Sequence, residues 1–150
     1  MSSPMSSPMY VAEPEVAYSK RAPLVVDSSV LAAWVFGEPR AAEAQARVQG
    51  HALFAPNLLI YEMANIGMNK IRSRQLDAPA AVKVLGHFHR FDVSYRQIEG
   101  AAMLTLAAKL KLTAYDAAYI CLAESLGAPL VTFDEALAKA ALAHFSKAAL

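Results

Sequence analysis

Four acidic residues stand where short apolar segments end or where helices are expected to run. Asp27 directly follows the apolar residues 24–26, and Asp134 follows the mostly apolar residues 129–133. Asp116 falls in the first turn of a predicted helix, and Glu62 lies within a largely apolar helical segment. If these carboxylates converge, one pair about 4 Å apart costs about 4 kcal/mol at an effective dielectric of 20, so the cluster requires protons or cations. An all-oxygen ligand set favours Mg²⁺ or Mn²⁺, and such an ion activates water against a phosphate ester.

The segments that must position these acids alternate between short apolar runs and longer helical patterns. We predict strands over residues 24–26, 52–55, 91–93 and 129–132, and helices over 28–36, 39–48, 57 onward, 77–90, 96–110, 113–127 and 135–149. Strands separated by helices imply right-handed crossovers and an α/β fold whose parallel sheet has helices on both faces. In such sheets the active site lies beyond the carboxyl ends of the strands, so we expect the three aspartates at that edge.

Helix capping is the main alternative role for the aspartates. Asp27 precedes two serines and could cap the helix that follows it. One capping box would join Thr113 to Asp116, and another would begin at Thr132. Capping explains each single aspartate as well as catalysis does. An active site is absent only if capping or solvation explains all four acids at once, which demands more than any one of these explanations alone.

Glu62 is not explained by capping. It lies about five residues inside its predicted helix, where the effect of the terminal dipole has faded. Asn65 and Asn69 follow it on the same helix face, and a polar stripe on an otherwise apolar helix indicates a wet cavity. The alternative is an ordinary solvated glutamate.

Length and composition favour a single domain. The chain has 150 residues, of which 56% are hydrophobic, and we assign residues 23–150 to one globular domain. Residues 1–22 repeat Met-Ser-Ser-Pro and are predicted to form a flexible tail. No apolar run reaches the length of a membrane span, so we expect a cytoplasmic protein without membrane contact. The single cysteine, Cys121, is interpreted as a buried thiol.

The distribution of charge is more informative than the net charge of +1. Residues 70–111 contain eight Lys or Arg residues against three acids, which leaves a local excess of five positive charges. Lys70, Arg72 and Arg74 are our candidates for phosphate contacts, because basic residues set the affinity and the salt dependence of nucleic-acid binding. A solvated helix end is the alternative interpretation of these three residues.

Four segments carry a resemblance to a known family. Residues 25–31 (VVDSSVL), 61–65 (YEMAN), 112–119 (LTAYDAAY) and 131–134 (VTFD) resemble the successive motifs of PIN-domain ribonucleases, and in particular the VapC toxins of bacterial toxin–antitoxin pairs. The similarity extends over about residues 23–147, and the third segment is its most specific part. The tail departs from the family, whose members usually begin almost directly with the first strand.

The resemblance implies a PIN-like three-layer α/β/α domain with a central, mainly parallel sheet. It also implies an RNA substrate, Mg²⁺ or Mn²⁺ as cofactor, a homodimer, and a VapB-like antitoxin that occupies the acidic groove. The residues that match the metal-binding acids of the family are Asp27, Glu62, Asp116 and Asp134. Those expected to support them are Ser28, Ser29, Asn65 and Thr132.

Our hypothesis is therefore metal-dependent hydrolysis of RNA. Asp27 and Asp116 would hold the principal ion, Glu62 would complete its shell or position the water, and Asp134 would support a second or weaker ion. The alternatives within the family are a non-toxin PIN nuclease in RNA processing and a non-catalytic interaction module. A phosphoaspartate receiver domain would need adjacent acids at the first strand. A haloacid-dehalogenase-like phosphatase would need a second aspartate where Ser29 stands.

Overall fold

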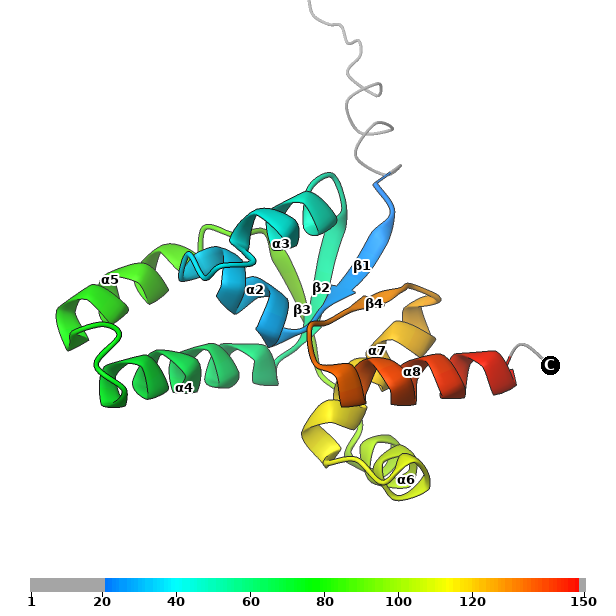
Figure 1. Ribbon diagram of the computed structural model, residues 1–150. Coiled ribbons are helices and arrows are strands. Elements are labelled where there is room, and N and C mark those ends of the chain that lie inside the picture. The colour runs from blue at the N-terminus through cyan, green and yellow to red at the C-terminus, as the bar shows by residue number, and fades with distance from the viewer. Residues whose placement is uncertain (1–20, 149–150) are drawn as a thin grey trace, which may run out of the picture.

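The sheet lies between two layers of helices in the computed structural model, which describes residues 21–148 (Figure 1). Its strands are β1 (Pro23–Val26), β2 (Ala52–Pro56), β3 (Val93–Arg96) and β4 (Leu130–Val131), in the spatial order β3-β2-β1-β4. All three pairings are parallel. The helices are α2 (Ser28–Val35), α3 (Ala41–Val48), α4 (Leu58–Arg72), α5 (Ala78–Phe88), α6 (Gly100–Leu110), α7 (Ala114–Leu126) and α8 (Glu135–Ala148).

One helical layer contains α2, α3, α4 and α5, and the other contains α6, α7 and α8 (Figure 1). The central strand β1 is buried by both layers, because Leu24, Val25 and Val26 are at most 2% exposed. Strands covered on both faces are continuous apolar runs, as β1 is. The predicted three-layer α/β/α fold with a parallel sheet is therefore confirmed.

Local capping fixes the ends of several helices. The side chain of Asp77 accepts a hydrogen bond from the Ala80 N–H at the start of α5, and Thr113 accepts one from the Asp116 N–H at the start of α7. Gly127 ends α7 at φ +60°, a left-handed conformation that glycine adopts without a Cβ penalty. Asn57 stands at the N-cap of α4 but makes no side-chain cap, because its own backbone is already helical.

Three predicted boundaries are wrong. The third strand is Val93–Arg96 rather than residues 91–93, because the Phe91 ring packs on Trp34 with centroids 4.6 Å apart and precedes the backbone ladder. The helix predicted from residue 96 begins at Gly100, since β3 extends through Arg96. The helix predicted from residue 39 begins at Ala41, with Arg40 at its N-cap.

Two further predictions concern burial and the chain ends. Cys121 is half-buried rather than fully buried, because it lies at the border of a small core cluster built around Ile120 and Leu137. Residues 1–20, most of the predicted tail, lie outside the described residues. None of the helices within residues 21–148 combines the length and the apolar character that crossing a membrane requires.

Candidate active site

The first and last acids come together because their strands are neighbours. Val26 of β1 pairs with Val131 of β4, and the Asp27 N–H donates to the Val131 carbonyl at 3.0 Å. Asp27 and the 132–134 loop therefore leave the sheet side by side at its carboxyl edge. This is the edge at which ligands bind in parallel α/β sheets.

Hydroxyl groups hold the Asp27 carboxylate. Its Oδ2 accepts hydrogen bonds from Ser29 Oγ at 2.7 Å and from Thr132 Oγ1 at 2.8 Å, and the residue is only 6% exposed. An ionised carboxylate can only accept hydrogen bonds, so two hydroxyl donors satisfy it and fix its rotamer. Ser29 and Thr132 thus both contact the first acid, and their role as supports of a metal site stays a prediction.

The same two hydroxyls fix the loop that carries the last acid. Ser29 Oγ accepts from the Phe133 N–H at 2.9 Å, and Thr132 Oγ1 accepts from the Asp134 N–H at 2.9 Å. Asp134 also caps α8, because its Oδ1 accepts from the Leu137 N–H at 3.1 Å. The capping box expected from Thr132 is therefore wrong in detail, since the side chain that caps α8 belongs to Asp134.

Glu62 is anchored by a partner that sequence reasoning missed. The hydroxyl of the fully buried Tyr119 donates to Glu62 Oε1 at 2.6 Å. Burial raises the pKa of the Glu62 carboxyl, and the charges of Asp27 and Asp116 add to this rise, while the hydroxyls of Tyr119 and Ser28 oppose it. Tyr119 follows Asp116 by three residues on α7, so helical spacing places both on one face and was the available signal.

Asp116 experiences the remaining charges of the cluster. Burial raises the pKa of its carboxyl, and the charges of Asp134 and Asp27 raise it further. Each of the four acids therefore either experiences or exerts repulsion at this edge. Among residues 21–148, no three His, Cys, Asp or Glu side chains lie close enough together to form a metal-binding group in this conformation.

Two exposed aromatic rings flank Glu62. A hollow of about 450 Å³ is lined by Leu58, Tyr61, Glu62, Asn65 and Tyr115. Tyr61 is 76% exposed and Tyr115 is 67% exposed. Exposed aromatic faces beside a polar site suit the stacking of unpaired bases. Asn65 thus lines the same hollow as Glu62, as its place on the helix face predicted.

The basic candidates on α4 occupy different environments. Lys70 forms an ion pair with Glu38 at 2.7 Å, and its side chain is only 12% exposed. Arg72 and Arg74 are exposed at the end of α4. Ten residues separate Glu62 from Arg72, which corresponds to about 15 Å along a helix. Arg72 and Arg74 could therefore contact only RNA that extends well beyond the acids, whereas Lys70 is already paired.

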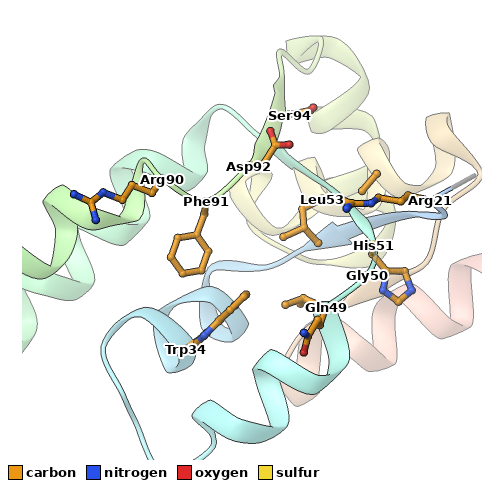
Figure 2. Close-up of a pocket in the computed structure, with 12 residues that line it drawn as sticks. Arg21, Trp34, Gln49, Gly50, His51, Leu53, Arg90, Phe91, Asp92 and Ser94 are labelled. Carbon is orange, nitrogen blue, oxygen red and sulfur yellow. The ribbon is translucent and has the colours of Figure 1, made fainter. Parts of the chain in front are cut away.

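The opposite edge of the sheet has a different chemistry. A hollow of about 580 Å³ opens at the amino ends of β2 and β3, where Trp34 and Phe91 pack edge to face (Figure 2). Asp92 is the one acidic residue among its lining residues in the described part of the chain. The carboxylates that could act together are therefore at the carboxyl edge, which we treat as the candidate active site.

Comparison with known proteins agrees with this fold. Residues 24–142 match the PIN domain family, and the chain belongs to that family. It is 36% identical over 121 residues to the protein named Ribonuclease VapC3 of Pyrobaculum aerophilum, a match that covers 77% of this chain and 92% of the relative.

Two solved structures share the fold. The crystal structure of PAE2754 from Pyrobaculum aerophilum superposes with a TM-score of 0.64 at 29% sequence identity, and 79% of each chain is covered. The structure of Mycobacterium tuberculosis VapC20, titled a sarcin-ricin loop cleaving toxin, superposes with a TM-score of 0.58 at 18% identity. That match covers 78% of this chain and 94% of VapC20, and it bears on the fold alone.

Proposed function

We propose that this protein is a metal-dependent endoribonuclease and the toxin component of a toxin–antitoxin pair. The observation that carries the proposal is the presence of four acids at the carboxyl edge of a PIN domain, where burial first, and then the charges of neighbouring acids, raise the pKa of Glu62 and of Asp116. The name of the 36% identical relative, Ribonuclease VapC3, supports the same reaction, and the resemblance of the sequence motifs to VapC toxins underlies the toxin role.

The donor set fits Mg²⁺ or Mn²⁺. Its side-chain ligands would all be carboxylate oxygens, which hard divalent cations prefer, and a cation would offset the neighbouring charges that add to the raised pKa of Glu62 and of Asp116. Asp27 and Asp116 would hold the principal ion, with Glu62 and Asp134 completing the set. The bound ion would activate water and neutralise the phosphate.

The remaining chemistry belongs to the chain itself. Ser29 and Thr132 both bond to Oδ2 of Asp27 and so hold this carboxylate in one rotamer. Burial raises the pKa of Glu62, which Tyr119 holds by a hydrogen bond, and a raised pKa makes a carboxylate a better acceptor of a proton from attacking water. Arg72 and Arg74 would contact distant phosphates of the bound RNA.

The proposed partners follow from the toxin role and from the surface. Large apolar side chains are exposed at Ile60 (51%) and Met68 (41%) on α4, and at Val82 (69%) on α5. Exposed apolar residues near a functional site suit protein–protein contact. We assign this surface to contacts with a VapB-like antitoxin or with a second copy in a homodimer, and we place the protein in the cytoplasm.

Cleavage of a labelled total-RNA pool tests the proposal. We expect the purified protein to cut RNA with Mg²⁺ or Mn²⁺, to stop in EDTA, and to lose all cutting in an Asp27→Asn, Asp116→Asn double variant. Absence of cleavage by folded, metal-loaded protein free of antitoxin would contradict a ribonuclease and favour a non-catalytic PIN-like module. Cleavage without toxicity on expression would favour a PIN nuclease of RNA processing.

A further inference from the structure

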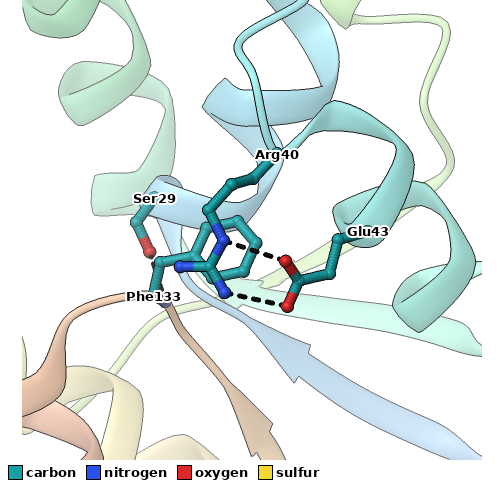
Figure 3. Close-up of polar contacts among 4 residues, drawn as sticks. All are labelled: Ser29, Arg40, Glu43 and Phe133. Carbon is teal, nitrogen blue, oxygen red and sulfur yellow. Dashed lines mark hydrogen bonds and ion pairs between the residues drawn. The ribbon is translucent and has the colours of Figure 1, made fainter.

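Arg40 reaches across the loop that carries the last acid. Its guanidinium carbon lies 3.7 Å from the centroid of the Phe133 ring, and Phe133 directly precedes Asp134. Glu43 holds the guanidinium through two hydrogen bonds, from Nε at 2.9 Å and from Nη2 at 2.8 Å (Figure 3). Arg40 is therefore fixed from two directions, by an aromatic face and by a bidentate carboxylate.

Stability alone does not account for this arrangement. The side chains of Arg40 and Glu43 are 54% and 59% exposed, and such surface ion pairs add little to folding. Glu43 occupies two of the five N–H donors of the guanidinium. In the described part of the chain no acceptor is paired with the other three. A preorientated arginine with unused donors is suited to recognition, because less entropy is lost when a ligand binds.

A hollow lies directly beside this arginine, and we call it the Arg40 hollow. It has a volume of about 460 Å³ and is lined by Ser29, Ala32, Ala33, Glu38, Pro39, Arg40, Ile66 and Phe133. Its walls are largely apolar, with a guanidinium and a carboxylate among them. Ser29 also donates to Asp27, so the hollow opens beside the acids. Its size falls within the range of about 300–1,000 Å³ typical of small-ligand pockets.

We propose that the Arg40 hollow binds a guanine base of the nucleotide next to the cleaved phosphodiester bond. This inference rests on the proposed ribonuclease function. Arginine donors pair with O6 and N7 of guanine, and this is the commonest base-specific contact that arginine makes. Glu38 lines the same hollow, and although its Oε2 is paired with Lys70 at 2.7 Å, a carboxylate has further acceptor sites for the N1–H and amino group of guanine. Adenine presents an amino donor where guanine has O6, so the guanidinium repels it.

Short single-stranded RNAs with one cleavage site test the inference. The set varies only the base on each side of the cleaved bond, and kcat/KM is measured for each RNA. We expect guanine at one of the two positions to be preferred over adenine by about 5-fold to 100-fold in the wild type. Arg40→Met should reduce that ratio to near one. Arg47→Met, which removes an exposed arginine on α3, the helix that follows Arg40, should leave it unchanged.

Measuring both binding and cleavage distinguishes a failure of this inference from a failure of the proposed function. Binding of the same RNAs is measured by fluorescence anisotropy in an Asp116→Asn background, where no cleavage is expected. If the protein cuts all members equally, or if Arg40→Met keeps the preference, the guanine site is wrong while the ribonuclease stands. If the wild type cuts nothing but binding favours guanine in an Arg40-dependent way, the Arg40 hollow binds guanine, while the catalytic proposal and the place of the guanine beside a cleaved bond both fail.

Discussion

The Tyr119 hydroxyl lies 2.6 Å from Oε1 of Glu62 and joins α7 to α4 across the candidate active site. Tyr119 is fully buried, and both burial and the charge of Glu62 raise the pKa of its phenol, so it remains a donor at physiological pH. This contact fixes the orientation of the one acid that lies deep within a helix. It also connects that helix to α7, which carries Asp116.

Tyr119→Phe should lower activity and shift its pH dependence. The hydroxyl lowers the pKa of Glu62, so its loss should raise that pKa and move the acidic limb of the kcat/KM profile to higher pH. We expect a loss in stability of about 1 kcal/mol, the typical net value of one hydrogen bond. The pH–rate profile and urea unfolding measure the two effects.

Tyr61→Phe is the matched control for this change, because Tyr61 is 76% exposed on α4. It should leave the acidic limb of the profile and the stability unchanged. An unshifted limb in Tyr119→Phe would show that the hydroxyl does not control the charge of Glu62.

Asp116→Asn should stabilise the metal-free protein at neutral pH while it abolishes cleavage. The pKa of Asp116 is raised in the folded state, so the folded protein binds this proton more tightly than the unfolded chain does. The stability contributed by the protonated group is complete below the unfolded pKa and is lost as pH rises through the raised pKa. Above that range the wild type carries a charge penalty that the variant lacks.

Thermal unfolding in EDTA at pH 5 and pH 7.5 measures this effect. For a domain of this size, 1 kcal/mol corresponds to about 4 °C in Tm. We expect a higher Tm for Asp116→Asn than for the wild type at pH 7.5, and a smaller difference at pH 5. Asp92→Asn, at an exposed acid on the opposite edge of the sheet, should show no such pattern. A lower Tm for Asp116→Asn at pH 7.5 would contradict the repulsion.

Thr132→Val should impair both strand-end acids. Thr132 donates to Asp27 Oδ2 and accepts from the Asp134 N–H, so the variant leaves a buried carboxylate with one donor fewer. An unsatisfied buried group costs about 1–3 kcal/mol, and we expect at least a tenfold loss in kcat. Thr105→Val, at an exposed helical position on α6, is the control and should be near wild type. If both variants have the same kinetics, Thr132 does not support the active site.

Local signals were sufficient to predict the elements that carry the acids. A continuous apolar run identified β1, while Thr113 and Gly127 marked the ends of α7 because caps depend on neighbours in sequence. The predicted start of the edge strand β3 is wrong by two residues. Phe91 is apolar and so resembles a strand residue, but its ring packs against Trp34 before the strand begins. Apolar periodicity does not distinguish ring packing from strand pairing.

Contacts between distant residues could not be predicted in the same way. The Tyr119 hydroxyl bonds to a carboxylate 57 positions away, and Ser29 accepts from a backbone N–H 104 positions away. Both contacts depend on the order of the strands and on how the helices pack. The sequence pattern predicts a parallel α/β fold but not these details. The contact of Arg40 with Phe133 likewise requires the loop after β4 to lie beside α3.

Binding of Mn²⁺ to the purified protein, measured by electron paramagnetic resonance at pH 7.5, tests whether these acids form a metal site. We expect saturable binding by the wild type, competition by Mg²⁺, and loss of that binding in the Asp27→Asn, Asp116→Asn double variant. Asp92→Asn should bind as the wild type does. Equal Mn²⁺ binding by the double variant, or no saturable binding by the wild type, would contradict a metal site built from these acids.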